Sequence, residues 1–131
     1  KINRALTSIN LSDCDIGDEG CKALGEGLKS NGALTSINLS GCFGIGDYDW
    51  KALAEGLETD QALSSINFSG CHIGDEGSKA LAEGLKSNKA LTSINLSGCV
   101  RECRGIGDEG CKALAEGLKS NRVVKSISLP C

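Results

Sequence analysis

The sequence predicts an α/β solenoid, in which a curved parallel sheet lines the concave side and helices line the convex side. Three observations support this fold class. A seven-residue phrase returns at nearly constant intervals, each copy is followed by a helical pattern, and the unit varies in length at one point only. Self-similarity at a period of about 20–50 residues is the sequence signature of stacked repeat architectures. With 131 residues, the chain is expected to form a single domain, 1–131.

The repeated phrase begins at Leu6 as Leu-Thr-Ser-Ile-Asn-Leu-Ser and returns at Leu34, Leu63 and Leu91, with a decayed copy at Val124. The longer units carry their extra residues between the cysteine that follows the phrase and the next isoleucine. Length variation at one point is typical of a loop on a solenoid surface. The predicted repeats are 6–33, 34–62, 63–90 and 91–123, followed by a partial repeat at 124–131.

Within each unit the hydrophobic period changes from that of a strand to that of a helix. Ile9 and Leu11 alternate with polar residues, which predicts a short strand with one buried face. Asp18 is predicted to cap the following helix at its N-terminus, and Asn31-Gly32 marks the end of that helix. Successive strands joined by helices pair in parallel, and each unit can bury its apolar stripe only against its neighbours.

Two further positions recur once per repeat and have structural interpretations. The aspartates could suggest a metal ladder, but N-capping accounts for each of them without a metal. The glycines in the middle of the helices cost about 1 kcal/mol each relative to alanine, which indicates a close approach of helix to sheet. The aspartates are Asp18, Asp47, Asp75 and Asp108, and the glycines are Gly27, Gly56, Gly84 and Gly117.

The string Leu6-x-x-Ile9-x-Leu11-x-x-Cys14-x-Ile16 resembles the leucine-rich repeat signature L-x-x-L-x-L-x-x-N/C-x-L. The 28-residue unit, the cysteine in the Asn/Cys position and the full helical return resemble the ribonuclease-inhibitor-like subfamily. NOD-like receptors and Ran GTPase-activating proteins carry repeats of this kind. The resemblance covers nearly the whole chain and implies a segment of a right-handed horseshoe. It implies little about the particular function, because the family binds unrelated partners on one scaffold.

The eight cysteines of the chain are arranged by the repeat rather than as a disulfide framework. Four of them take the same position just after a strand, where stacking would bury the thiols as a structural ladder and let each donate to a neighbouring carbonyl. This favours reduced cysteines in an intracellular, cytoplasmic setting. The alternative is a secreted protein with Cys99 and Cys103 bridged in the long loop. The ladder consists of Cys14, Cys42, Cys71 and Cys99.

Several function classes are disfavoured by composition and spacing. A net charge of −3 argues against a broad nucleic-acid surface, and no apolar run has the length of a bilayer crossing. The segment 105–110 fits G-x-G-x-x-G but lacks the strand and acidic residue of a dinucleotide site. One histidine, His72, cannot form a His-based metal site or catalytic dyad. We therefore expect no cofactor, no metal and no enzymatic activity.

Departures from the repeat are the better candidates for binding, because the scaffold does not need them. In the second repeat, Tyr48 and Trp50 are predicted on an exposed helix edge, where they would anchor a protein partner. The alternative is that Trp50 merely covers the neighbouring helix. In the fourth repeat, Arg101 and Arg104 occupy the inserted loop and form either a docking site or solvated loop residues.

The concave face supplies a second set of candidates, which the strand alternation exposes. It carries serine and asparagine without charged or aromatic residues, whereas family members usually bind ligands there through varied charged and aromatic side chains. This composition puts conventional concave recognition in doubt. The candidates are Ser36, Asn38, Ser65, Asn67, Ser93 and Asn95.

These features predict a non-enzymatic scaffold that binds another protein of unknown identity, from an intact solenoid or from a piece of a longer array. The alternative is a self-associating structural module. Its apolar terminal repeats lack caps, and its acidic first half and basic second half would favour a homodimer. A GTPase regulator is the third hypothesis and rests on the family resemblance and the two loop arginines alone.

Overall fold

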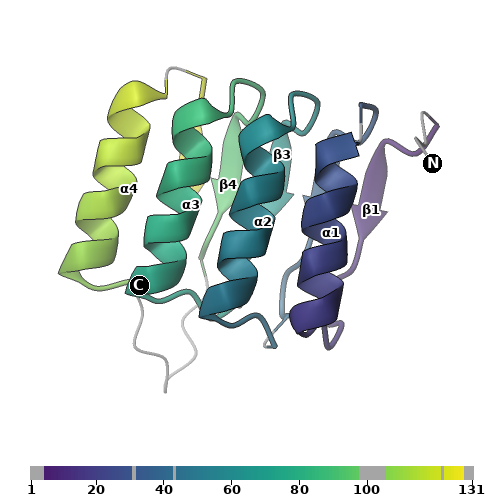
Figure 1. The fold of residues 1–131 in the computed structure, drawn as a ribbon, viewed down its shortest axis with the longest axis horizontal. Coiled ribbons are helices and arrows are strands. Elements are labelled where there is room, and N and C mark those ends of the chain that lie inside the picture. The colour runs from purple at the N-terminus through teal and green to yellow at the C-terminus, as the bar shows by residue number, and fades with distance from the viewer. Residues whose placement is uncertain (1–4, 31, 43, 98–105, 122, 129–131) are drawn as a thin grey trace.

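The computed structural model describes residues 5–30, 32–42, 44–97, 106–121 and 123–128. Strands and helices alternate along the chain and form two layers, with the helices side by side in front of the sheet in Figure 1. This arrangement confirms the predicted α/β solenoid. The strands are β1 (Ser8–Asn10), β2 (Ser36–Asn38), β3 (Ser65–Asn67), β4 (Ser93–Asn95) and β5 (Ser126–Ser128). The helices are α1 (Asp18–Ser30), α2 (Asp47–Thr59), α3 (Asp75–Ser87) and α4 (Asp108–Ser120).

The sheet is parallel throughout, in the order β1-β2-β3-β4-β5, so neighbours in the chain are neighbours in space. The register is exact at the repeat level, because Ile9 pairs with Ile37 and Ile66 pairs with Ile94. Strands in a sheet lie about 4.8 Å apart, whereas packed helices need about 8–10 Å. Since each unit contributes one strand and one helix, the array must curve with the sheet on its inner side.

The hydrophobic core lies between the two layers and is continuous along the array. The central strand residues Ile37, Ile66 and Ile94 are buried, and they meet the leucines on the inner faces of the helices. The apolar stripes of the described helices are shared between units, because each of these helices also packs on at least one neighbouring helix. The stacked units therefore share one core, as the repeat pattern predicts.

The helices begin one residue earlier than predicted, at the recurring aspartates themselves. The N-cap residues are the preceding glycines, among them Gly74 and Gly107, whose backbones are extended. The prediction that the aspartates cap their own helices is therefore wrong. Asp75 instead caps the next helix, because its Oδ1 accepts hydrogen bonds from the backbone N–H groups of Gly107 (2.8 Å) and Gly110 (2.9 Å). The carboxylate thus satisfies free amides of α4 and links two repeats.

The recurring helix glycines mark close approaches between helices, not between helix and sheet as the sequence suggested. A Cβ atom added at Gly56 would lie 2.5 Å from the carbonyl oxygen of Gly25, and one at Gly84 would lie 2.9 Å from that of Ala54. Both obstacles are backbone atoms of the preceding helix, which cannot move aside cheaply. At Gly27, in the same position of α1, an added Cβ meets nothing within 4 Å.

This difference predicts opposite effects for the same substitution in two repeats. Gly56→Ala should lower the free energy of unfolding by about 1–3 kcal/mol, because the methyl group would overpack the α1–α2 contact. Gly27→Ala should raise it by up to about 1 kcal/mol, because alanine favours the helix and meets no obstacle. Urea denaturation followed by far-UV circular dichroism measures both changes. Shifts of the same sign would contradict the helix–helix assignment.

Candidate protein-interaction surface

The two aromatic residues of α2 point in different directions. Tyr48 is 89% exposed, whereas Trp50 is 1% exposed. The prediction that Trp50 lies on an exposed edge is wrong, because residues two apart on a helix are separated by about 200°. The Trp50 indole N–H donates to the carbonyl oxygen of His72 at 3.0 Å. Its ring centroid lies 4.7 Å from that of Phe68, with the ring planes at 65°. Trp50 therefore stabilises the packing between the second and third repeats.

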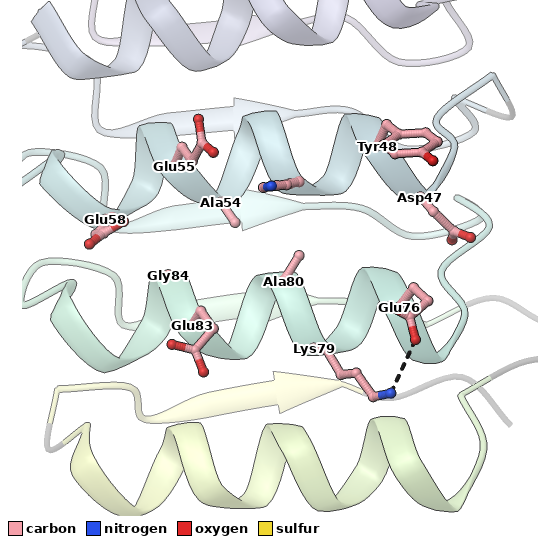
Figure 2. A pocket seen from close by; sticks show the side chains of 11 residues that line it. Asp47, Tyr48, Ala54, Glu55, Glu58, Glu76, Lys79, Ala80, Glu83 and Gly84 are labelled. Atoms are coloured by element: carbon pink, nitrogen blue, oxygen red, sulfur yellow. Dashed lines mark hydrogen bonds and ion pairs between the residues drawn. The ribbon is translucent and has the colours of Figure 1, made fainter.

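Tyr48 stands at one end of a groove that runs between α2 and α3 on the helical side of the molecule. The groove has a volume of about 490 Å³. Small residues line its middle, and charged residues line its two sides, as Figure 2 shows. We call this feature the α2–α3 groove. Its lining residues are Asp47, Tyr48, Lys51, Ala54, Glu55 and Glu58 from α2, and Glu76, Lys79, Ala80, Glu83 and Gly84 from α3.

Ion pairs on the helix surfaces set α2 apart from its neighbours. The other three helices carry Glu–Lys pairs at i,i+3, with N···O distances of 2.7–3.2 Å. In α2, Tyr48 takes the position of the first glutamate, and Glu58 takes the position of the last lysine. As a result, α2 has no intrahelical ion pair within the described part of the chain. The surface of α2 thus keeps charged groups that its sibling helices neutralise.

A buried carboxyl group lies at the start of α2, where the sibling repeats have glycine. Asp49 is 3% exposed, and its Oδ2 accepts a hydrogen bond from the backbone N–H of Gly46 at 2.8 Å. Burial raises the pKa of Asp49 above its ordinary value, and the nearby Asp18 carboxyl raises it further. The hydrogen bond from Gly46 opposes this shift. The net effect disfavours the charged form of Asp49 in the folded protein.

The raised pKa of Asp49 predicts a pH dependence of stability with a defined sign. The folded state holds its proton to higher pH than the unfolded state, so Asp49 destabilises the fold progressively as pH rises above about 4. Asp49→Asn should therefore raise the melting temperature at pH 7 and leave it nearly unchanged at the acid end of the stable range. Melting curves of both proteins across pH check this expectation. A gain of equal size at every pH would contradict it.

On the sheet side, the predicted serine and asparagine candidates are half-buried in the three central strands. The asparagine side chains are engaged with the backbone: Oδ1 of Asn38 accepts the N–H of Ser40 at 2.9 Å, and Asn67 and Asn95 make the same contact. This turn at the strand end accounts for the repeated asparagine without a ligand. The prediction that this face binds a partner remains untested by the structure.

The cysteine positions combine burial with hydrogen bonding along the array. Cys42 Sγ donates to the carbonyl oxygen of Leu11 at 3.2 Å, and Cys71 Sγ donates to that of Leu39 at 3.0 Å. Cys14, at the same repeat position, is exposed. Burial raises the pKa of Cys71 to about 11 and that of Cys21 to about 12. The described cysteines, which are Cys14, Cys21, Cys42, Cys71 and Cys111, form no disulfide with one another.

Thiol reactivity should follow this division. Cys14 and Cys111 should react with iodoacetamide in the native protein, because they are exposed. Cys21, Cys42 and Cys71 should react only after denaturation, since burial and raised pKa values suppress the nucleophilic thiolate. Peptide mapping by mass spectrometry after timed alkylation identifies each site. Rapid labelling of Cys71 in the folded protein would contradict this prediction, because it would show that the thiol is accessible to the reagent.

The inserted loop of the fourth repeat lies outside the described residues, and with it Arg101, Arg104, Cys99 and Cys103. The structure therefore does not test their predicted roles. Within the described ranges, no group of three or more His, Cys, Asp or Glu side chains is arranged to hold a metal ion. None of the helices in these ranges has the length and apolar character needed to cross a membrane.

The fold and the repeat define a class of protein. A family model described as "Leucine Rich repeat" matches residues 3–25, 60–82 and 87–115, which is more than half of the chain. The chain belongs to the leucine-rich repeat family. This result confirms the family resemblance found in the sequence.

Solved structures share the architecture at low sequence identity. One is titled "Leiomodin-1 Actin-Binding Site 2 (ABS2)" and is 23% identical, with a TM-score of 0.83 over 96% of this chain and 71% of that one. Another is a tropomodulin C-terminal domain from Caenorhabditis elegans, 14% identical, with a TM-score of 0.81 over 97% of this chain and 75% of that one. No curated protein matches the sequence. At these identities the similarity establishes the fold alone.

Proposed function

We propose that the chain is a non-enzymatic scaffold of ribonuclease-inhibitor-like repeats that binds another protein, and that it acts in the cytoplasm. The observation that carries the proposal is the exposed Tyr48 at the end of the α2–α3 groove. A large aromatic side chain that the scaffold does not bury is a typical anchor of protein interfaces. The thiols of Cys42 and Cys71, buried and hydrogen-bonded to backbone, support a reducing compartment.

The experiment uses a variant that keeps the repeat pattern. Tyr48→Glu installs the residue that sibling helices carry at this position, beside Lys51, so the fold should be retained. Immobilised wild-type protein and the variant are compared for partner recovery from a cell extract. Because a structural neighbour is titled an actin-binding site, filamentous actin is the first purified partner to test, by co-sedimentation.

The matched control is Lys112→Gln on α4, which also lowers the net charge by one and lies away from the groove. We expect recovery of the partner by wild type and Lys112→Gln, and loss of recovery with Tyr48→Glu. Equal recovery by all three proteins would remove Tyr48 and this groove from the proposal.

A second function, self-association, is favoured by a separate observation. An apolar hollow of about 450 Å³ lies beside β1 and α1, and Leu6 at its edge is 45% exposed. Its other lining residues include Ile9, Leu11 and Leu24, which are the residue types that inner repeats bury against a neighbour. A second copy stacked there would extend the sheet in a head-to-tail manner. Light scattering across a concentration series tests this, and a monomer at high micromolar concentration would exclude it.

A further inference from the structure

We propose that the α2–α3 groove binds a basic, lysine- or arginine-rich segment of a protein partner. This inference rests on the proposed function and names the chemistry of the partner. The groove is lined by five carboxylates and two lysines. Two of the carboxylates are already in ion pairs, because Glu76 pairs with Lys79 at 3.1 Å and Glu83 pairs with Lys86 at 2.7 Å. The charged groups left without an ion pair among the described residues are therefore mainly acidic, and a cationic segment is the complementary occupant. They are Asp47, Glu55, Glu58 and Lys51.

Part of the acidic character of this groove comes from α2, because this helix departs from its siblings at a charged position. Glu55 and Glu58 lie at i,i+3, where the other helices place a glutamate and a lysine. Two like charges at this spacing destabilise an isolated helix slightly. Lys29 of α1 lies near both glutamates, but its own hydrogen bond goes to Glu26 at 3.0 Å. The two carboxylates thus have no ion-pair partner of their own among the described residues.

The shape of the groove suits a long, flexible cationic side chain. Its middle is lined by the small residues Ala54, Ala80 and Gly84. Because α2 and α3 are in close contact at Ala54 and Gly84, an aliphatic stem would lie over this part of the helical surface and not between the helices. Tyr48 and Asp47 mark one end of α2 and Glu58 the other, as Figure 2 shows. A lysine or arginine lying along the groove can therefore contact carboxylates with its head group, and a second cation can stack on the Tyr48 ring.

The test measures binding of a fluorescein-labelled hexa-arginine peptide by fluorescence anisotropy at low salt. Glu58→Lys is the key variant, because it restores the Glu–Lys pair of the sibling helices and should fold as well as the parent. Glu19→Lys is the matched control, since it changes the charge equally on α1 at a position that does not line the groove. Circular dichroism verifies that all three proteins are folded.

We expect Glu58→Lys to weaken binding of the peptide about five- to tenfold, and Glu19→Lys to weaken it less than about twofold. Absence of hexa-arginine binding, or equal weakening by both variants, would overturn the inference. A Tyr48-dependent partner whose recovery is unaffected by Glu58→Lys would likewise overturn it, while leaving the proposed function intact. If Tyr48→Glu recovered the partner as well as the wild-type protein did, that result would instead count against the proposed function.

Discussion

Trp50→Ala should lower the free energy of unfolding by about 3–5 kcal/mol, the largest loss expected from one side chain in this chain. The indole fills the joint between the second and third repeats, where it contacts the Phe68 ring. An added Cβ at Gly77 would lie 2.8 Å from the Trp50 ring, so α3 already packs directly on the indole. Truncation would leave a cavity between the second and third repeats and would remove the indole N–H that donates to the His72 carbonyl. Urea denaturation followed by circular dichroism measures the loss.

Two controls separate packing from hydrogen bonding and from general aromatic loss. Tyr48→Ala removes an aromatic residue from the same helix, but its effect should stay within about 0.5 kcal/mol because the side chain is exposed. Trp50→Phe keeps most of the ring and removes the N–H donor to His72, so its cost should fall between the other two. If Trp50→Ala and Tyr48→Ala had equal effects, Trp50 would not hold the repeats together.

The fold could be predicted from the sequence because every repeat carries the same apolar pattern at nearly the same spacing. Alternating apolar residues in each copy, such as Ile37 and Leu39, fix a strand with one buried face. Equal spacing of the copies fixes parallel pairing in register. Since every copy carries the same pattern, the register observed between Ile37 and Ile66 follows from the repeat length. Where one copy departs from the pattern, the other copies still indicate the same strand and helix.

The sequence could not predict features that depend on which neighbouring element a residue meets. Tyr48 and Trp50 lie about 200° apart around α2, but only the packing of Trp50 against Phe68 of the third repeat shows which of the two is buried. The partners of Gly56 and Asp75 lie in adjacent repeats, so a pattern within one unit does not identify them. The α2–α3 groove is likewise formed between units. Its acidic residues can be read from the sequence, but the sequence does not show that they line the same groove.

Another such feature is a row of side chains that follow the helices at Asp60, Asn88 and Asn121, and among these the second repeat differs. Asn88 Nδ2 donates to the carbonyl oxygens of Leu57 (2.7 Å) and Asp60 (2.9 Å), while its Oδ1 accepts the N–H groups of Ala90 and Leu91. Asn121 repeats this arrangement one unit further along. The amide group thus ties each helix end to the preceding one and fixes the return into the next strand.

Asp60 occupies the equivalent position in the second repeat but lacks the amide donor. Its Oδ1 accepts the N–H groups of Ala62 (2.9 Å) and Leu63 (2.7 Å), as in the siblings. Its Oδ2 is buried and has no hydrogen-bond partner among the described residues. By the register of the repeats, this oxygen stands where Nδ2 of Asn88 donates to backbone carbonyls. An acceptor there is unsatisfied and incurs a desolvation cost.

Exchanging the two residue types should therefore change stability in opposite directions. Asp60→Asn should raise the free energy of unfolding by about 1–3 kcal/mol, because it supplies the missing donor without changing the side-chain shape. Asn88→Asp should lower it by about 2–4 kcal/mol, because two buried carbonyls lose their donor and face an acceptor. Urea denaturation of the two variants beside the parent protein measures both shifts. If Asp60→Asn left the free energy of unfolding unchanged while Asn88→Asp lowered it, Asp60 Oδ2 would have a hydrogen-bond partner in solution. The amide donor would then not be needed at this position of the second repeat.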